Sequence, residues 1–292
     1  MTMIFNEISI IGLGLIGTSI LHAIKAKEDK EIKTFAYDIN SEHRSIVSEM
    51  NIATYVCDNI KEAIKTSDLI ILAIPVGAMK SVADLIGPHL KPEAIVTDTG
   101  STKLSVIKDV KSAIPNINFF IPSHPLAGTE YSGPKSGFGS LFENRYWLII
   151  CDRETKQTKK LACFFKRLGS IVETVNVDYH DRILAITSHL PHLIAYTIVG
   201  TASDLETDLK NDVIKFSASG FRDFTRIASS DPIMWRDIFV NNSEAVLEML
   251  QRFNEDLSDL QKAIRKKDGE KLHSFFSRTK SIRERIIDAG QN

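Results

Sequence analysis

The side chains best suited to chemistry gather in one short stretch, Ser123 to Gly133, which reads SHPLAGTEYSG. It combines a histidine and a carboxylate with hydroxyl groups, a proline and two glycines. The apolar runs Ile117–Ile121 and Arg145–Cys151 on either side predict buried β-strands, so the stretch should be a loop that leaves a sheet edge and returns to it. Loops held by a rigid scaffold are where reactive side chains usually sit. Since a neutral histidine accepts a proton readily near pH 7, His124 is the candidate base of this loop.

A glycine-rich turn near the N-terminus predicts a dinucleotide site. The strand-like run Ile8–Ile11 leads into GLGLIG, which opens the helical pattern Thr18–Lys27. In such a unit the first glycine makes the tight turn, the second lets the backbone approach a pyrophosphate, and the third lets helix and strand pack closely. The phosphate then rests on the free N–H groups of the helix N-terminus. The expected cofactor contacts in this turn are Gly12, Gly14, Leu15, Ile16 and Gly17.

Asp38 indicates which dinucleotide is bound. It ends the next predicted strand, Lys33–Tyr37, and stands twenty-one residues after Gly17, where an acid accepts the ribose hydroxyls. The alternative is a structural turn followed by a surface aspartate. A carboxylate here would repel the 2′-phosphate of NADP, so NAD is the expected cofactor. Arg44, six residues further on, is a cation that would suit that phosphate, so the strictness of the preference stays open.

The alternation of strand and helix then continues, which predicts a doubly wound parallel sheet covered on both faces. Leu69–Ile74 is an apolar strand closed by Pro75, Val76–Ile86 is a helix, and Ala94–Asp98 is the next strand. Ligands bind at the carboxyl ends of such strands, where Pro75 and Ser101 stand. Ser101 also suits the N-cap of a helix Thr102–Val110, and the two roles are compatible. A helix Glu154–Leu168 and a strand Ser170–Val175 close this half.

The second half shows only helical spacing, and we place the boundary near Asn176, giving domains 1–176 and 177–292. The expected helices are Tyr179–Thr201, interrupted by Pro191, then Pro232–Lys267, which stops at Gly269, and Glu270–Ala289. The first is apolar on nearly every face. A helix of that kind must be buried on all sides, which so small a domain cannot do alone, so a homodimer through the helical half is predicted.

Two polar features interrupt the apolar helices. His189 and His192 lie three apart, but no further ligand stands at a matching interval, so no metal site is expected. Arg222 and Arg226 lie four apart, a spacing that on a helix gives a double clamp for carboxylates. The flanking Phe221, Phe224 and Ile227 favour partial burial over a solvated charge pattern.

The composition limits the class of protein. The formal net charge of −1 gives no drive toward nucleic acid or an anionic membrane surface. Three scattered cysteines fit a reduced, cytoplasmic compartment. We expect no export signal and no apolar run long enough to span a bilayer.

Five motifs together resemble the prephenate dehydrogenase family: GLGLIG, TGSTK, SHPLAGTEYSG, SHLPH and SGFRDFTRIASSDPIMWRDIF. The resemblance runs from Ile8 to about Phe253. It implies a Rossmann domain followed by a helical dimerisation domain, and an enzyme that converts prephenate and NAD to 4-hydroxyphenylpyruvate, carbon dioxide and NADH.

The same resemblance implies roles for individual residues. His124 would accept a hydrogen bond from the substrate hydroxyl, and Ser101 would orient His124 and the nicotinamide. Arg226 would bind a substrate carboxylate, with Arg222 guiding or gating, at a position where many relatives have lysine. The pocket would also include His192, Thr129 and Glu130, the last pairing with an arginine when no substrate is bound. Trp235 reads as a core residue more than a substrate contact.

Other functions stay open at this stage. A β-hydroxyacid dehydrogenase would place a lysine base on the apolar helix, which here carries His189 and His192. A catalytically idle NAD(H) sensor would need a second interaction surface, and no basic recognition helix is evident. Within the favoured family, arogenate differs from prephenate only by an amino group in place of the keto group. Prephenate is preferred because no acid near Arg222, Asp223 excepted, is placed to hold an ammonium.

Overall fold

The computed structural model describes residues 5–27, 32–204, 215–216 and 218–288. Ala289, the last residue of the expected C-terminal helix, and residues 290–292 lie outside the described residues.

The N-terminal part of the chain forms the expected parallel α/β fold. Within the described residues, five strands run in the order β3-β2-β1-β4-β5, and all neighbours are parallel. The sequence patterns identified four of these strands but missed α2, β3 and α3. The elements are β1 (Glu7–Ile11), α1 (Leu15–Ala26), β2 (Lys33–Tyr37), α2 (Ser41–Met50), β3 (Tyr55–Val56), α3 (Ile60–Ile64), β4 (Leu69–Leu72), α4 (Met79–Ile86), β5 (Ile95–Asp98) and α5 (Leu104–Ala113).

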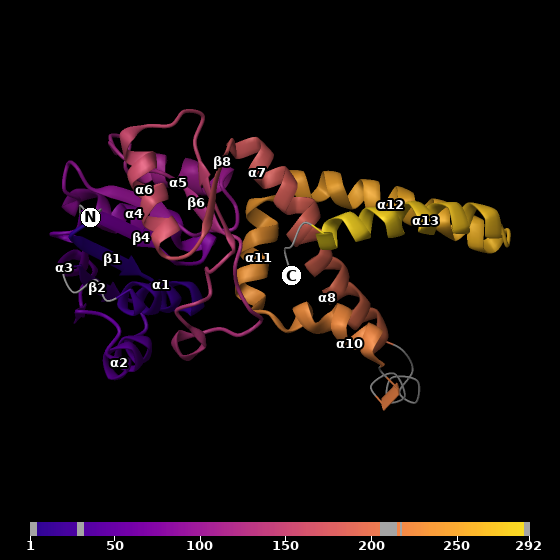
Figure 1. The fold of residues 1–292 in the computed structure, drawn as a ribbon, viewed down its shortest axis with the longest axis horizontal. Helices are drawn as coiled ribbons and strands as arrows, with labels where there is room; N and C mark the ends of the chain where they lie inside the picture. Colours follow the sequence, from indigo (N-terminus) through magenta and orange to yellow (C-terminus); the bar gives the residue numbers. More distant parts are fainter. Residues whose placement is uncertain (1–4, 28–31, 205–214, 217, 289–292) are drawn as a thin grey trace. The chain divides into compact units, whose positions relative to one another are not determined.

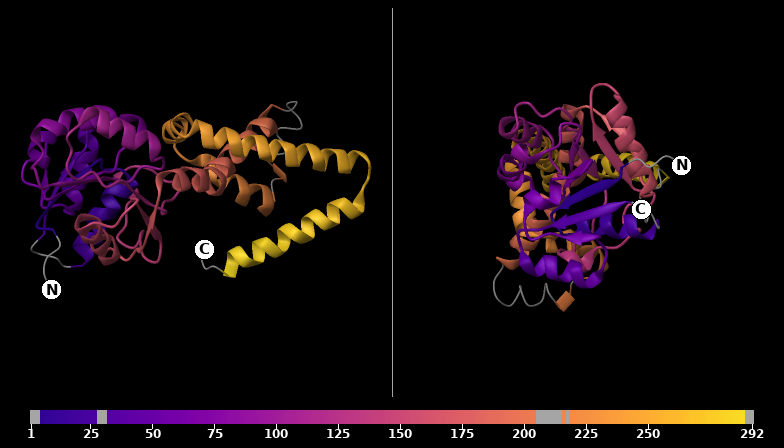
Figure 2. Two further views of the ribbon diagram at one scale, coloured as in Figure 1. Left: turned by 90° about the horizontal axis from the view of Figure 1, so that it is seen from above. Right: turned by 90° about the vertical axis from the view of Figure 1, so that its left-hand side faces the viewer.

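Strand β4, which lies between β1 and β5, contributes to two hydrophobic cores. Leu69 and Ile71 pack with residues of α1 and α6 (Lys156–Arg167), whereas Ile70 and Leu72 pack with residues of α3, α4 and α5. Successive residues of a strand point to opposite faces, so a strand buried on both faces reads as an unbroken apolar run. Helices therefore cover the sheet on both sides, as the views in Figure 2 show.

The reactive stretch begins inside a second sheet and not in a loop. Among the described residues, β6 (Ser123–Pro125), β7 (Tyr146–Ile150) and β8 (Ile171–Val175) form a three-stranded sheet in that order. Strand β6 runs antiparallel to β7 and pairs His124 with Leu148. Helix α6 connects β7 to β8 in the chain.

The expected strand Ile117–Ile121 is wrong, because only a single bridge, between Phe120 and Val96, forms there. Pro122 has no N–H group to continue that pairing. Its carbonyl oxygen instead accepts a hydrogen bond from the backbone N–H of Ile150 at 2.9 Å. The chain therefore passes from the first sheet to the second at Pro122.

A long helical rod follows the second sheet (Figure 1). It consists of α7 (Val177–Leu184), a π-helical segment Ala185–His189, and α8 (Leu190–Ser203). Pro191 lies in the first turn of α8, where its missing N–H is tolerated, so it does not interrupt the rod as expected. The sequence pattern thus identified the rod but missed its π-helical segment.

The rod is long and apolar enough to cross a membrane, by length and composition, which makes the expectation that no such run exists wrong. Within the described residues the segment is Val177–Ser203, in which an 18-residue window has a mean hydropathy of 1.4. The core helix of a soluble protein passes the same test. Only 28% of the apolar window is buried within the chain, and Ile198 and Val199 are each 39% exposed. The apolar surface of this helix is therefore not covered by its own chain.

Shorter helices follow: α10 (Ser219–Thr225), a 3-10 turn Arg226–Ser229, and α11 (Pro232–Asn241). Asp231 caps α11 as expected, accepting hydrogen bonds from the backbone N–H groups of Ile233 and Met234 at 2.8 and 2.9 Å. The expected continuous helix Pro232–Lys267 is wrong, because Asn242 leaves helical geometry with φ −122° and ψ 32°. Its side chain instead contacts the carbonyl oxygen of Asp181 and Nδ1 of His189.

The chain divides into two compact units, residues 1–243 and 244–292. The second unit contains α12 (Ser243–Arg265) and α13 (Gly269–Asp288), joined by a short turn that is visible in Figure 2. Lys267, with φ 55°, takes the left-handed conformation after α12, and Gly269 begins α13 instead of stopping the helix before it. Asn176 caps α7 through a 2.8 Å bond from Tyr179 N–H; the domain boundary near this residue stays a prediction.

Candidate active site

His124 is a buried, neutral histidine. It lies on β6, is 8% exposed, and its Nδ1 is 3.0 Å from Nε2 of His180. Burial lowers the pKa of His124 well below its usual value, and electrostatic interactions with His180, Lys103 and His189 lower it further. A histidine with so low a pKa is unprotonated at neutral pH and can accept a proton.

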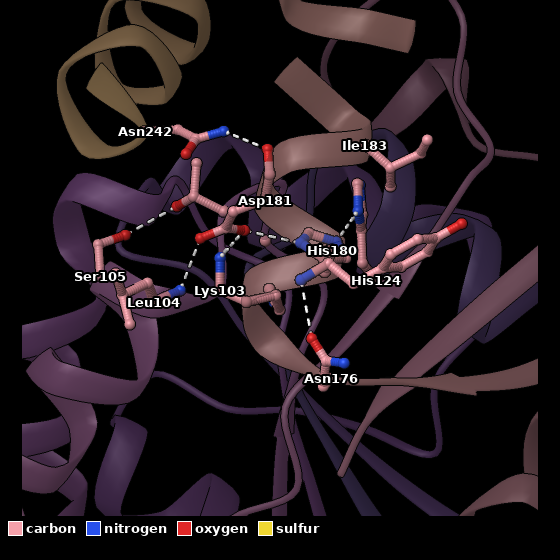
Figure 3. A network of polar contacts seen from close by, with 12 residues as sticks. Lys103, Leu104, Ser105, His124, Asn176, His180, Asp181, Ile183 and Asn242 are labelled. Carbon is pink, nitrogen blue, oxygen red and sulfur yellow. Dashed lines mark hydrogen bonds and ion pairs between the residues drawn. The ribbon is translucent and has the colours of Figure 1, made fainter. Parts of the chain in front are cut away.

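His180 and Asp181 complete a chain of polar contacts behind His124 (Figure 3). Nδ1 of His180 is 2.7 Å from Oδ1 of Asp181. His180 is fully buried and Asp181 is 6% exposed. Sequence analysis missed both residues. Their adjacency in the helical segment VDYHDRIL was the only signal, and it resembles an ordinary surface pair.

Asp181 also caps helix α5. Its Oδ1 accepts a hydrogen bond from Lys103 N–H at 2.8 Å, and its Oδ2 accepts one from Leu104 N–H at 2.9 Å. Burial alone would raise the pKa of Asp181, but the hydrogen bonds from His180 and from the α5 backbone outweigh it and lower that pKa. The expectation that Ser101 is the N-cap is therefore wrong, since α5 begins at Leu104 and its cap comes from α7.

A buried ion pair between Lys103 and Asp98 holds the start of β6, the strand that carries His124. Nζ of Lys103 contacts Oδ2 of Asp98, and both side chains have no exposed surface. The same Nζ donates to the carbonyl oxygen of Ser123 at 2.7 Å. Ser123 Oγ donates to Asp98 O at 2.7 Å and accepts from Trp147 Nε1 at 3.0 Å. The residue before His124 is thus fixed to the end of β5 by several hydrogen bonds.

The glycine turn has the shape that a dinucleotide requires. Gly12 has φ +97°, and a Cβ there would lie 2.2 Å from the carbonyl oxygen of Ala73. A Cβ on Gly17 would lie 1.9 Å from the carbonyl oxygen of Gly12. At Gly14 nothing lies within 4 Å of the same position, so a phosphate can approach the backbone there. No side chain caps α1, whose first residues Leu15 and Ile16 present their N–H groups.

Asp38 lies against this turn. Its Oδ2 accepts a hydrogen bond from Leu13 N–H at 2.7 Å, and its Oδ1 accepts one from Asn40 N–H at 2.8 Å. Arg44 is held by an ion pair with Asp58 at 3.2 Å and by a 2.8 Å bond to the carbonyl oxygen of Asp38. The carboxylate therefore stands where the ribose hydroxyls are expected, and the nearby arginine already has partners.

Replacing Asp38 with serine should raise the KM for NAD about tenfold and improve the use of NADP, because the acceptor for the ribose hydroxyls and the charge that repels a 2′-phosphate are both lost. Steady-state kinetics with each cofactor would measure the change. Asp84→Ser is a matched control, since Asp84 is an exposed acid paired only with Lys80 on α4. An unchanged KM for NAD in the Asp38 variant would contradict this role.

Arg226 and Glu130 form an ion pair. Arg226 NH1 donates to Oε2 of Glu130 at 2.9 Å, which meets the expectation that Glu130 pairs with an arginine. Arg226 follows α10 in the 3-10 turn, and its side chain is 58% exposed. Phe221 and Ile227 are partly buried, whereas Phe224 is 45% exposed and both arginines are exposed, so the partial burial expected here is found only in part. Arg222 is exposed, as is Thr129, whose Oγ1 accepts from Tyr131 N–H at 3.3 Å.

His192 stacks on Trp235, with ring centroids 3.6 Å apart. Burial lowers the pKa of His192, and the charge of Arg226 lowers it further, against the hydrogen bond that His192 Nδ1 donates to the carbonyl oxygen of Ser188. His189 is fully buried, its Nδ1 lies 3.1 Å from Nδ2 of Asn242, and burial lowers its pKa to about 4. Trp235 is 6% exposed and packs in the core. The described residues contain no cluster of three or more potential metal ligands.

The structure thus groups the expected site residues into several sets. His124 belongs to the network with His180 and Asp181, Arg226 contacts Glu130, and His192 contacts Trp235. Ser101 is half-buried after β5, and Pro75 ends the segment after β4, with its carbonyl oxygen accepting from Ala78 N–H at 2.9 Å. For all of the expected site residues, the roles toward cofactor and substrate stay predictions.

Comparison with known proteins identifies the family. Two family models match: the prephenate dehydrogenase nucleotide-binding domain over residues 22–177 and the prephenate dehydrogenase dimerization domain over residues 176–278. The chain is 39% identical to the cyclohexadienyl dehydrogenase of Zymomonas mobilis over 96% of both proteins. It is 29% identical to the prephenate dehydrogenase of Bacillus subtilis, over 97% of this chain and 77% of that protein.

A solved structure gives the same result. The prephenate dehydrogenase of A. aeolicus, crystallised in complex with hydroxyphenyl propionate and NAD+, is 29% identical to this chain. It superposes with a TM-score of 0.88 over 98% of this chain and 99% of that one. The resemblance inferred from the sequence motifs is confirmed, and the protein belongs to the prephenate dehydrogenase family, whose members are NAD-dependent oxidoreductases.

Proposed function

We propose that this protein catalyses the NAD-dependent oxidative decarboxylation of prephenate to 4-hydroxyphenylpyruvate and carbon dioxide in tyrosine biosynthesis. The observation that carries the proposal is His124, a buried histidine with a strongly lowered pKa whose Nδ1 is already engaged by His180. It supplies the neutral acceptor that an alcohol oxidation requires. The relatives from B. subtilis and A. aeolicus, both prephenate dehydrogenases, support the same activity.

The chain's own residues have distinct tasks in this reaction. His124 accepts the hydrogen bond of the ring hydroxyl through Nε2 and holds its proton while hydride leaves the carbon that bears the hydroxyl. The bond to the ring carboxylate breaks, and its electron pair completes the aromatic ring, so no protein acid is needed for loss of carbon dioxide. Bound NAD supplies the hydride acceptor. The glycine turn, Asp38 and the strand ends at Pro75 and Ser101 hold the cofactor, while Arg226, Arg222, His192 and Thr129 hold the substrate.

The ion pair between Arg226 and Glu130 suggests how substrate enters. A carboxylate of prephenate replaces Glu130 as the partner of Arg226, since charge-assisted bonds to an arginine are strong and can be bidentate. Before substrate binds, Glu130 therefore holds the guanidinium of Arg226 near the position in which it binds the substrate carboxylate.

Replacing Arg226 with glutamine should raise the KM for prephenate about thirtyfold, with a smaller effect on kcat, because a hydrogen bond to a charged group contributes about 1.5–3 kcal/mol. Initial-rate kinetics at saturating NAD would measure this. Arg252→Gln is the matched control: its side chain is 66% exposed and is ion-paired with Glu248 at 2.8 Å. Equal effects of the two substitutions would rule out a substrate contact by Arg226.

Arogenate is the second candidate substrate. The relative from Zymomonas mobilis is a cyclohexadienyl dehydrogenase, which favours an enzyme that accepts both prephenate and arogenate. Prephenate remains our choice for the main substrate, because the relatives from B. subtilis and A. aeolicus are prephenate dehydrogenases.

We also propose that the protein is a homodimer in the cytoplasm. The match to a dimerization domain over residues 176–278 and the uncovered apolar rod of α7 and α8 support a dimer through the helical half. Cys57, Cys151 and Cys163 are free, which supports a reducing compartment.

The deciding experiment offers prephenate and then arogenate to the purified protein, each with NAD and with NADP, and follows the absorbance of the reduced cofactor. Faster turnover of prephenate with NAD is the expected result. Turnover of arogenate alone would change the assigned substrate, and with it the branch of tyrosine biosynthesis, but would leave the proposed mechanism unchanged. No turnover of either substrate by protein that still binds NAD would overturn the proposed function.

A further inference from the structure

Three buried side chains form a directed chain of hydrogen bonds that ends at the proposed base. Asp181 Oδ1 is 2.7 Å from His180 Nδ1, and His180 Nε2 is 3.0 Å from His124 Nδ1 (Figure 3). His180 has no exposed surface, and Asp181 and His124 are 6% and 8% exposed. Water therefore has little access to these contacts, and the three side chains must satisfy one another.

The direction of the chain follows from the donors around Asp181. Two backbone N–H groups, of Lys103 and Leu104, already donate to this carboxylate, which is held ionised and can only accept. The hydrogen in the contact with His180 must therefore lie on Nδ1 of His180. A neutral imidazole carries one hydrogen, so Nε2 of His180 is an acceptor.

The next contact then has only one arrangement. Nε2 of His180 accepts, so the hydrogen between the two rings lies on Nδ1 of His124. Because His124 is also neutral, its Nε2 is left with a free lone pair. Burial lowers the pKa of both histidines, which agrees with one hydrogen on each ring.

We propose that Asp181 and His180 are positioning residues that fix the tautomer of His124, so that Nε2 always presents its lone pair to the substrate hydroxyl. This inference rests on the proposed function, because it names what holds the base of that reaction. A carboxylate that orients a histidine by the opposite ring nitrogen has the same effect in other enzymes. Here a second histidine stands between the carboxylate and the base.

Asp181 also connects the base to the cofactor side of the site. The two N–H groups that it caps begin α5, directly after the Thr99–Ser101 segment at the carboxyl end of β5. One carboxylate therefore sets the position of His124 and the start of the helix that follows Ser101. The other charged or titratable groups that face this chain are Lys103, Asp98 and His189.

Two substitutions of His180 separate orientation from packing. In His180→Gln, the side-chain carbonyl can still accept from Nδ1 of His124 while the amide group donates to Asp181. In His180→Leu neither contact is possible. We expect kcat to fall about a hundredfold in the leucine variant and less than tenfold in the glutamine variant, with KM values for prephenate and NAD little changed. His89→Gln, at an exposed histidine, is the control for the substitution itself.

Asp181→Leu tests the direction of the chain. Oδ1 of Asp181 accepts from both Lys103 N–H and His180 Nδ1, and without this acceptor nothing fixes the hydrogen on Nδ1 of His180. Both rings can then adopt the reversed tautomer, with a hydrogen on Nε2 of His124. We expect kcat to fall at least as far as in His180→Leu, across the whole pH range in which the fold persists. A loss restored by changing pH would contradict a tautomer effect.

The tautomer of His124 can be determined by NMR without measuring enzyme activity. Long-range 1H–15N correlation spectra of the 15N-histidine-labelled protein distinguish a ring nitrogen that bears hydrogen from one that does not, and comparison with His124→Asn identifies the His124 signals. The expected wild-type form has hydrogen on Nδ1 of His124, which is retained in His180→Gln and is mixed with the Nε2 form in Asp181→Leu. Hydrogen on Nε2 in the wild type, or equal kcat in the leucine and glutamine variants, would overturn the inference. A correct tautomer in a protein that turns over neither substrate would support it while removing the proposed function.

Discussion

Replacing His124 with asparagine should lower kcat about a thousandfold while leaving the affinity for NAD unchanged. General base catalysis by a positioned histidine contributes about 10²–10⁴ in rate, and no atom of asparagine reaches the position of the histidine Nε2. The asparagine amide can still donate to His180, so the buried network should survive. Absorbance of NADH under saturating prephenate would give kcat, and titration of NAD by intrinsic fluorescence would give the affinity.

The pH dependence gives this prediction a second part. A base works in its unprotonated form, so activity is lost as pH falls through its pKa. Because burial lowers the pKa of His124 well below the usual value, kcat/KM should stay level as pH falls through the range in which an ordinary histidine becomes protonated. His89→Asn, at an exposed histidine, is the control for the substitution of His124. If His124→Asn kept a tenth or more of the wild-type kcat, His124 would not be the base.

Replacing Lys103 with methionine should lower the free energy of unfolding by about 3–5 kcal/mol, because it leaves the carboxylate of Asp98 buried without its cation. Both side chains of the pair are fully buried, and Lys103 Nζ also holds the carbonyl oxygen of Ser123. Burial lowers the pKa of Lys103, and the interaction with Asp98 opposes that shift. Denaturant unfolding followed by circular dichroism would measure the change.

Two further variants test the cause of that loss. Adding Asp98→Asn should recover part of the stability, since an amide can keep the hydrogen bond from Gly100 N–H without leaving a buried charge. Lys80→Met breaks an exposed pair with Asp84 on α4 and should cost no more than about 0.5 kcal/mol. A similar cost for Lys103→Met and Lys80→Met would mean that the buried pair contributes little.

Local patterns were enough to predict the nucleotide-binding half, and contacts distant in sequence explain where prediction failed. The turn from Gly12 to Gly17 and the strand that ends before Asp38 follow from residues that are near one another in the chain. The N-cap of α5 does not, because it comes from Asp181, 77 residues beyond Leu104. The same holds for His180, whose partner His124 is 56 residues away. No spacing rule within one element contains that information.

The helical half shows the same limit at Asn242. Helical periodicity continues through this residue, so the sequence predicted one helix from Pro232 to Lys267. In the fold, Nδ2 of Asn242 donates to the carbonyl oxygen of Asp181 at 2.9 Å and contacts His189 Nδ1 at 3.1 Å. These buried bonds, 61 and 53 residues distant in sequence, hold the backbone out of helical geometry. Helical periodicity alone cannot reveal distant hydrogen bonds that compete with the helix.

The π-helical segment Ala185–His189 has a consequence for the angular order of the polar residues on the rod. At about 100° per residue, a regular helix would set His180 and His192 roughly 120° apart around its axis. A π-bulge absorbs one extra residue, which reduces that angle to about 20°. His180 and His192, which a regular helix of this length would place on different faces, therefore lie on one side of the rod. Deleting a single residue between Ala185 and His189 would leave eleven steps of about 100° in a regular helix, so His192 would stay on the side that His180 occupies.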